Sequence, residues 1–400
     1  MKQLCLIFGL LAGFWSQAQY QDLLVPAGAQ KSQSKILYLR FQDLSFIKDN
    51  EYFNLIADGY TLLGNQLHID FNYRPQPNYK ITMGVSLLKY DGLSVFSKIV
   101  PYLGLEIDQG NSTFYLGKLY TADNHGLADE IYTFERQLDQ RHIENGLQHR
   151  FKNKHWQTDT WLQWEHFIFK GDTLRERLNF GQTTTYKTSF HHWTVLFPFQ
   201  VYLQHRGGQI NLKKPYDDPK NNAIVIANGL SGLAVENRLN KQTTIGLQYL
   251  YYVFRTNTNR PEELIFTSGT AQKFQIYLKH RHWTTFLAFW HANRFVAPKG
   301  NDMFQSISRR TERFLDQNNQ TVSVFKNHTE PNRKLLCLTT TYHKEIFKNL
   351  NLAFVIDVYD QLNHSSLQST YYQSDIYHQL DYALGLYLLY KFDFKLLSIK

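Results

Sequence analysis

The chain has 400 residues, of which 43% are hydrophobic, 16% are aromatic and 19% are charged, and its formal net charge is +9. A typical globular chain has a charged share of about 25%. The high aromatic share therefore argues against a disordered chain, a collagen or a coiled coil, and it favours extensive β structure. No apolar run of roughly 18 residues follows the first twenty positions, which excludes a membrane protein built from several helices.

The N-terminus has the pattern of an export signal. Lys2 precedes an apolar run, and the small residues Ser16 and Ala18 stand where a signal peptidase cleaves. We therefore expect residues 1–18 to be a cleaved signal peptide, 19–34 a periplasmic arm and 35–400 a β-barrel. Cys337 is the single cysteine left after cleavage, so no disulfide can form within the mature chain, and a bacterial export route is favoured.

Period-two alternation dominates the rest of the chain. Leu67, Ile69 and Phe71 share one face of a predicted strand, and His68 and Asp70 lie on the other. The strands of soluble sandwiches are mostly about 5 to 6 residues long. A tilted strand that crosses a bilayer needs about 9 to 11, and the alternating segments reach that length. The pattern predicts strands with one face toward lipid.

The connections between these segments alternate between short and long. Short periplasmic turns and longer outer loops are typical of transmembrane barrels. We predict an all-β fold, a transmembrane antiparallel β-barrel of about 16 strands, with 14 to 18 acceptable, in the bacterial outer membrane. Both chain ends are expected on the periplasmic side, and the barrel is expected to be a single domain.

One predicted outer loop, residues 121–143, is unusually rich in charged side chains. It either folds back into the lumen and pairs with the wall, or stands in solvent with weak surface ion pairs. Inward folding is the favoured interpretation, and it would form a constriction. The candidate constriction residues are His125, Asp129, Glu130, Glu135, Arg136, Asp139 and Arg141.

The predicted polar inner face indicates a hydrated lumen, because about 16 strands enclose more space than side chains fill. The leading hypothesis is a passive channel for small hydrophilic solutes, with the positive net charge favouring anionic solutes and lipopolysaccharide phosphates as partners. The alternative is a barrel that binds or exports cell-surface polysaccharide. Its candidate sugar-stacking residues are Trp161, Tyr202 and Tyr277.

A barrel enzyme is a third reading, but we expect no enzymatic activity and assign no catalytic residue. Nothing resembles a nucleophile elbow. The pair His191 and His192, and the pair His280 and His282, lack a third ligand at useful spacing, so no metal or cofactor is expected. Nucleic acid is not an expected partner, because basic residues are interleaved with acidic ones.

Several short motifs carry a resemblance to a known group of proteins. They are Glu51–Asn54, Gly59–Leu62, Asn124–Leu127, Phe134–Arg136 and Glu144–Gln148. With them the chain resembles uncharacterised outer-membrane β-barrels of Bacteroidota and, more distantly, porins and exopolysaccharide-associated barrels. The resemblance implies a barrel in contact with outer-membrane lipid and lipopolysaccharide, inserted by the barrel-insertion machinery. Such barrels commonly end on an aromatic residue, whereas this chain continues past Phe394 to Lys400.

Overall fold

The computed structural model describes the chain from residue 34 onward, with gaps. The described ranges are 34–169, 175–207, 223–257, 265–315, 321–362, 365–368, 373–376 and 380–398. The signal peptide expected at 1–18, and all but the last residue of the arm expected at 19–34, lie outside these ranges. Within them, no helix is both long and apolar enough to cross a membrane.

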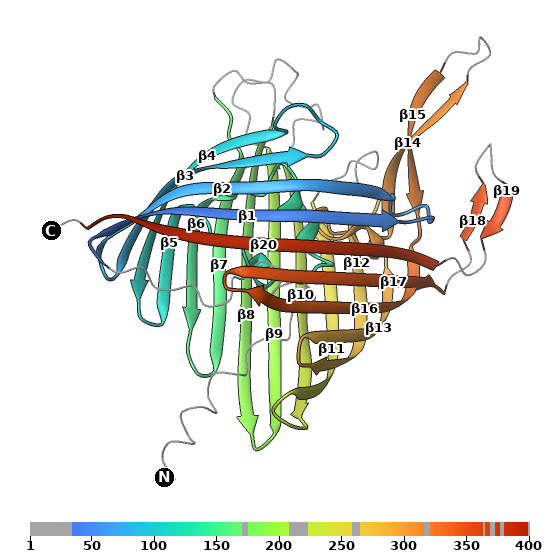
Figure 1. Ribbon diagram of the computed structural model, residues 1–400. Coiled ribbons are helices and arrows are strands. Elements are labelled where there is room, and N and C mark those ends of the chain that lie inside the picture. The colour runs from blue at the N-terminus through green and yellow to red at the C-terminus, as the bar shows by residue number, and fades with distance from the viewer. Residues whose placement is uncertain are drawn as a thin grey trace.

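Sixteen antiparallel strands form a closed barrel, which confirms the predicted fold class and strand number (Figure 1). The barrel closes where the first strand pairs with the last. Because a closed sheet pairs its backbone groups on both sides of every strand, it can cross hydrocarbon. The strands, in order around the barrel, are β1 (Ile36–Glu51), β2 (Tyr60–Gln76), β3 (Tyr79–Tyr90), β4 (Lys98–Gln109), β5 (Ser112–Lys118), β6 (Asn145–Lys152), β7 (Trp156–His166), β8 (Glu176–Phe190), β9 (Trp193–Gly207), β10 (Ile224–Arg238), β11 (Thr243–Thr256), β12 (Ser268–His280), β13 (Trp283–Asn293), β16 (Asn332–Phe347), β17 (Leu350–Gln361) and β20 (Leu380–Ser398).

Two small hairpins lie outside the barrel sheet, in segments that the pattern predicts as loops. Each forms its own two-stranded sheet. One pairs β14 (Ile307–Leu315) with β15 (Thr321–Thr329), and the other pairs β18 (Ser365–Gln368) with β19 (Gln373–Ile376).

Short turns gather at one end of the barrel and long loops at the other. The turn at 191–192 joins β8 to β9, and the turn at 281–282 joins β12 to β13. Their first residues, His191 and Arg281, have φ of 53° and 54°, the left-handed geometry of tight hairpin turns. Ile36 and Ser398, near the two chain ends, pair with each other at this same end. Short turns mark the periplasmic end of such barrels.

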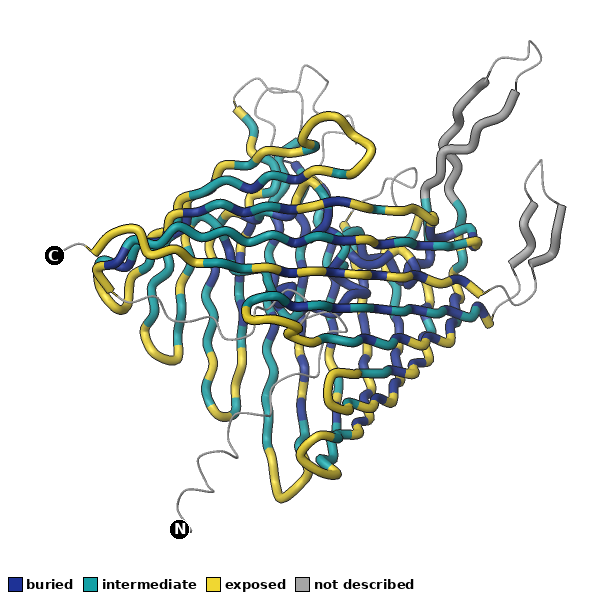
Figure 2. Tube along the Cα trace, in the orientation of Figure 1, coloured by how far each residue is buried: buried dark blue, intermediate teal, exposed yellow. Residues whose placement is uncertain are grey.

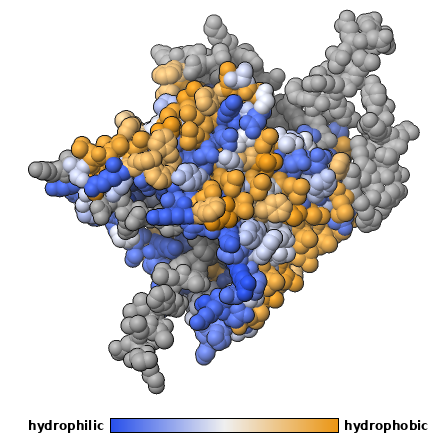
Figure 3. All heavy atoms as spheres, in the orientation of Figure 1, coloured by the Kyte–Doolittle hydropathy of each residue, from blue (hydrophilic) through white to orange (hydrophobic). Residues whose placement is uncertain are grey.

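The outer wall of the barrel is apolar. On β11, Leu247 and Tyr249 are 45% and 43% exposed, whereas Gln248 and Leu250 on the opposite face are buried. Figure 2 shows this alternation along the strands, and Figure 3 shows hydrophobic residues gathered on the outer surface. An exposed apolar wall around a closed sheet faces lipid, so the chain is a β-barrel of the outer-membrane type.

Segments from the long-loop end fold into the barrel and form a plug. We define the plug as residues 52–59, 119–144 and 294–306. It contains three short 3-10 helices, η1 (Asn124–Gly126), η2 (Phe134–Leu138) and η4 (Asp302–Phe304). Backbone hydrogen bonds join two of the segments, from Thr133 N to Lys299 O at 2.7 Å and from Asn301 N to Asp129 O at 2.9 Å.

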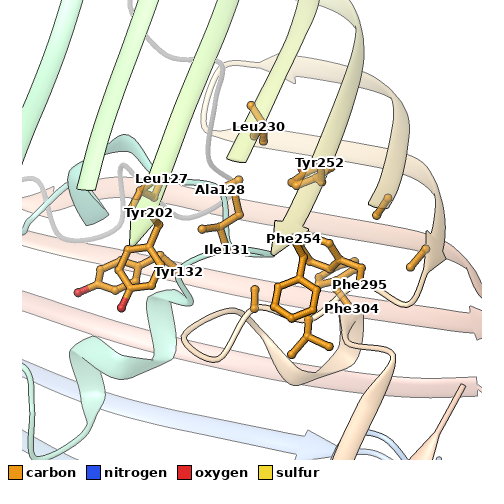
Figure 4. Close-up of a cluster of buried hydrophobic side chains, with 14 of the residues drawn as sticks. Leu127, Ala128, Ile131, Tyr132, Tyr202, Leu230, Tyr252, Phe254, Phe295 and Phe304 are labelled. Atoms are coloured by element: carbon orange, nitrogen blue, oxygen red, sulfur yellow. The ribbon is translucent and has the colours of Figure 1, made fainter. Parts of the chain in front are cut away.

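The main hydrophobic core lies between the plug and the wall. In Figure 4, Leu127, Ile131 and Phe295 of the plug belong to one buried cluster with Tyr252 and Phe254 of β11, and the centroid of the Phe295 ring lies 5.8 Å from that of the Tyr252 ring. At this level of the barrel the lumen holds packed protein, which corrects the predicted hydrated lumen. The inward residues of β10 to β13 include apolar side chains such as Leu230 and Trp290 and polar ones such as Gln248 and Lys273.

Candidate functional site

Buried ion pairs fasten the charged loop to the barrel wall. The Lys273 ammonium of β12 lies 2.6 Å from a carboxylate oxygen of Glu130, and the Tyr252 hydroxyl donates to the other oxygen at 3.1 Å. Glu135 accepts from the Asn50 amide at 3.2 Å and lies 3.5 Å from the Lys48 ammonium. The loop folds inward, and its residues Glu130 and Glu135 pair with the wall.

Two other candidate residues of this loop are Asp129, which lies inside the plug, and Arg141, which lies at its outer side. Asp129 is buried and accepts from Phe134 N and from the Asn301 amide, both at 2.8 Å. Its burial raises its pKa to about 6, against these hydrogen bonds. Arg141 is half-exposed and reaches Glu165 of β7 at 3.1 Å.

His125 is the centre of a buried charged cluster. Its Nε2 lies 3.1 Å from Glu144, its Nδ1 lies 3.4 Å from Asp159, and its ring stacks on Trp161. Burial opposes the charge of His125, but the two carboxylates outweigh it and raise the His125 pKa to about 9. Arg136 also pairs with Glu144. Its partners occupy both ring nitrogens, so His125 holds the plug together and is not free to act as a base.

Cavities lie on both sides of the plug. The outer cavity, about 390 Å³, is lined by Asn50 and Tyr60 at the outer strand ends and by Glu135 of the plug. The inner cavity, about 400 Å³, lies toward the periplasmic turns. Its lining includes Arg74, Lys80, Asp108, Gln137, His142 and Lys391. The plug residues 119–144 line both cavities and therefore stand between them.

A serine of the wall meets a plug histidine that lines the inner cavity. Ser86 is on the inward face of β3, and its hydroxyl lies 2.6 Å from Nε2 of His142 in the plug. Nδ1 of His142 lies 2.8 Å from the carbonyl oxygen of Asp139. Because that carbonyl can only accept, Nδ1 carries the proton and Nε2 is the basic nitrogen. This is the geometry of an activated serine nucleophile with an oriented base.

The base is held in its neutral form. Burial lowers the pKa of His142 to about 4, helped by the charges of Lys118 and Lys98 and opposed by the Asp139 hydrogen bond. Ser86 is fully buried and His142 is 3% exposed. The pair is therefore closed to solvent in this structure.

A second histidine stands next to Ser86 on the wall. His68 of β2 is the direct cross-strand neighbour of Ser86. Its Nε2 lies 3.2 Å from Oε1 of Gln66, whose amide nitrogen donates to Gln137 O at 3.0 Å. The amide orientation assigns the His68 proton to Nε2. Nδ1 of His68 is then a buried acceptor, and it has no partner among the described residues.

The chain contains a second serine and histidine pair at the periplasmic end. His149 of β6 lies 3.2 Å from the Ser112 hydroxyl of β5, and its ring stacks on Phe114 at a centroid distance of 4.4 Å. The outward position of Phe114, which is 41% exposed, places this pair on the outer wall. It lines none of the described cavities named above, and it supplies a matched control for the pair Ser86 and His142.

The candidate sugar-stacking residues lie buried in the structure. Trp161 packs against His125 and Tyr132 of the plug. The Tyr202 hydroxyl donates to Asn179, and the Tyr277 hydroxyl donates to Glu236. All three side chains are at most 1% exposed, so their rings contact protein.

Sequence reasoning missed both members of the pair Ser86 and His142. Alternation places Ser86 on an inward face, as it does many small polar residues. His142 lies within the charged loop, but its partner is 56 positions away. The pairing depends on strand register and on inward folding of the loop, neither of which alternation supplies. Among the described residues, no group of three or more His, Cys, Asp or Glu side chains could hold a metal ion.

Fold and site together define a class, a plugged outer-membrane β-barrel with a serine and histidine pair beside an inner cavity. The chain belongs to the Lipid A 3'-O-deacylase-type family, whose profile matches residues 29–399. This family is described by an enzymatic activity. The match overturns the expectation of a barrel without enzymatic activity.

Comparisons with curated proteins and solved structures give less detail. No curated protein matches. Among solved barrels, OprD of Pseudomonas aeruginosa is 10% identical, with 92% of this chain and 98% of that chain covered and a TM-score of 0.48. OmpT of Vibrio cholerae is 8% identical, with 91% and 100% covered and a TM-score of 0.45. An anion-selective porin from Comamonas acidovorans is 9% identical, with 89% and 99% covered and a TM-score of 0.45.

Proposed function

We propose that this barrel is an acyl-ester hydrolase of the outer membrane whose nucleophile is Ser86 and whose base is His142. The observation that carries the proposal is the 2.6 Å contact between the Ser86 hydroxyl and the neutral, oriented His142. The description of the family, a lipid A 3'-O-deacylase type, supports an acylated saccharide as the substrate.

The chemistry follows from the geometry of the pair. Ser86 Oγ attacks the ester carbonyl carbon while His142 Nε2 takes the hydroxyl proton. The tetrahedral intermediate collapses, the bond to the saccharide oxygen breaks, and His142 returns the proton to that oxygen. Water then cleaves the acyl-serine by the same route and releases a fatty acid. The Asp139 carbonyl keeps the His142 ring oriented throughout.

The experiment compares the two serine and histidine pairs found in the described part of the chain. Purified protein in detergent is incubated with lipid A and with a short-chain nitrophenyl ester, and released acyl chains are measured by mass spectrometry and absorbance. Ser86→Ala and His142→Asn are each expected to lower kcat by about a thousandfold or more, because the pair acts as a unit.

Ser112→Ala and His149→Asn are the controls and should keep wild-type rates. The electrophoretic shift between unheated and heated samples checks that every variant is folded. The proposal fails if folded Ser86→Ala protein hydrolyses both esters at the wild-type rate, or if the outer-wall pair proves to be the essential one.

A passive channel is the second candidate function. The polar inner cavity and the outer cavity favour a channel. The plug lies between these two cavities and is what closes the bore of the barrel. The polysaccharide alternative has less support, since the aromatic residues Trp161, Tyr202 and Tyr277 are packed within protein. Cleavage after residue 18, insertion by the barrel machinery and contact with lipopolysaccharide remain predictions within either proposal.

A further inference from the structure

We propose that the outer cavity is a binding site for an organic cation with a primary ammonium group, such as an aliphatic diamine, which enters from the outer surface. The inference goes beyond the proposed function, whose pair Ser86 and His142 does not line this cavity. It stands on the charges of the cavity, an unpartnered buried acceptor and a wall of tyrosine rings.

Acidic side chains outnumber basic ones in the outer cavity. Among the described residues that line it, five are acidic and three are basic. The acidic ones are Asp58, Glu135, Asp139, Glu165 and Asp302, and the basic ones are Arg136, Arg141 and Lys299. A cleft lined mainly by one sign of charge, with walls of low dielectric, concentrates ions of the opposite sign. The cavity therefore favours a cation.

The three basic side chains are already paired. Arg141 and Lys299 share the carboxylate of Glu165, at 3.1 Å and 2.8 Å. Arg136 pairs with Glu144, which lies inside the plug and does not line the cavity. These ion pairs thus engage one of the five lining carboxylates, and the other four are left to other partners.

Three of those four carboxylates lie near one another. Desolvation raises the pKa of Asp302 to about 6, and the negative charges of Glu135 and Asp58 add to this rise. Glu135 has the Lys48 ammonium at 3.5 Å, whereas Asp302 forms no salt bridge within the described part of the chain. A ligand ammonium beside Asp302 would relieve this repulsion, as the Lys48 ammonium does for Glu135.

Asn50 supplies a buried acceptor without a donor. Its side chain is 2% exposed and lines the cavity. The amide nitrogen donates to both carboxylate oxygens of Glu135 at 3.2 Å, and Oδ1 has no partner among the described residues. Leaving a buried acceptor unsatisfied is unfavourable. An ammonium N–H supplies the missing donor, whereas a quaternary ammonium does not.

Tyrosine rings form much of the remaining wall. Tyr52, Tyr60 and Tyr90 line the cavity together with Leu62. The face of a tyrosine ring attracts a cation, and ring and leucine carbons suit the methylene chain of an amine. A metal ion instead needs several oxygen or nitrogen ligands, and no group of three or more His, Cys, Asp or Glu in the described ranges could hold one. A volume of about 390 Å³ also has room for a small molecule.

The cavity opens toward the outer surface. Asn50 and Tyr60 are cross-strand partners at the outer ends of β1 and β2, and Tyr60 is 41% exposed. The plug separates this cavity from the inner one. The ligand therefore enters from outside the cell.

The first test measures binding by calorimetry, with folded protein in an uncharged detergent. The probes are 1,4-diaminobutane, tetramethylammonium, the neutral 1,4-butanediol and Mg²⁺. We expect saturable binding of the diamine, at least about tenfold tighter than that of tetramethylammonium, and no binding of the diol. Tighter binding of Mg²⁺ than of the diamine would indicate a site for an inorganic cation and would overturn the inference.

Removal of two cavity charges tests the location of the site. Asp58→Asn combined with Asp302→Asn should weaken diamine binding at least about tenfold, because the ammonium loses two nearby negative charges. The control is Asp91→Asn combined with Glu345→Gln. These two exposed acids lie outside the cavity, so the control loses the same charge and should match wild type. Equal binding by the cavity variant and the wild type would overturn the inference.

Asn50→Leu tests the acceptor separately. It should weaken binding of the diamine at least about fivefold and change that of tetramethylammonium by less than about twofold, because only the diamine has N–H groups to donate. An equal loss for both cations would contradict the role of Asn50 as an acceptor. The electrophoretic shift on heating checks that each variant is folded. Ser86→Ala should bind the diamine like wild type, so failure of the proposed hydrolysis leaves this inference standing.

The second test addresses the entry route. Tyr60 lines the cavity, and Cys337 is buried, so Tyr60→Cys introduces one accessible thiol. A membrane-impermeant thiol reagent should label this variant in intact cells, and 1,4-diaminobutane should slow the labelling. Asp91→Cys, in an exposed loop outside the cavity, should be labelled at a rate that the diamine does not change. Labelling of Tyr60→Cys only in permeabilised cells would contradict entry from the outer surface.

Discussion

At the scale of single residues, the surroundings of His142 decide when it can act as a base. It faces Ser86 of β3, His68 of β2, Lys98 of β4, Lys118 of β5 and the Asp139 carbonyl. Burial and then the lysine charges hold its pKa at about 4, far below the ordinary value of about 6.5. The base is therefore unprotonated at neutral pH, although its low pKa makes it a weak proton acceptor.

The pH profile of hydrolysis should report this environment. The acidic limb of kcat/KM belongs to the free enzyme, so we expect its midpoint near pH 4. Lys118→Met should raise the midpoint of the kcat/KM limb, because the charge of Lys118 lowers the pKa of His142, and Lys344→Met should leave it unchanged. An unshifted limb in Lys118→Met protein would contradict this account.

At the scale of elements, the plug depends on buried pairs between loop and wall. Glu130 and Lys273 are 2% and 3% exposed and lie 2.6 Å apart. The cost of desolvation offsets much of the electrostatic attraction within such a pair. Removing one partner, however, leaves the other charge unpaired in the protein interior. The pair therefore positions the plug more than it adds to stability.

Removing one member of this pair should loosen the plug. Glu130→Gln is expected to lower the free energy of unfolding by about 3 to 5 kcal/mol, measured by urea titration in detergent. Lys273→Met combined with Glu130→Gln should cost less than the sum of the single changes, because neither charge is then unpaired. Lys279→Met, in the more exposed pair with Glu236, should cost about 1 kcal/mol or less. Equal costs for the two pairs would contradict this account.

The elements show how much of the fold can be predicted from the alternation of polar and apolar residues. Leu247 and Gln248 reveal the two faces of β11 without any knowledge of its neighbours, so strands, turns and closure were predictable. Glu130 is different, because its charge suits solvent as well as a buried pair with Lys273. The site is still harder to predict from the sequence. Ser86 meets His142 only through register and plug packing, and His68 acquires its tautomer only through Gln66 and Gln137.

At the scale of the whole molecule, the plug determines whether the barrel conducts. Its main segment separates the two cavities, and its apolar residues pack against β10 to β13. A bore crossed by packed protein passes ions only when that protein moves.

Planar-bilayer recordings test this closure and the channel hypothesis together. Wild-type protein is expected to show little conductance. Glu130→Gln combined with Glu135→Gln, which loses two anchors of the plug, should show frequent openings. Ser112→Ala, on the outer wall, serves as the inserted and folded control. Large, steady conductance by the wild type would support the channel candidate and contradict a closed plug.

The plug also constrains the order of biogenesis. Its segments come from parts of the chain far apart, and the contact between Asn54 and Met303 spans 249 positions. A nascent barrel cannot complete this contact until β13 has been laid down and the following loop has entered. A partly assembled barrel would therefore lack its plug and be permeable. The cell gains if the plug inserts soon after the last strands are added.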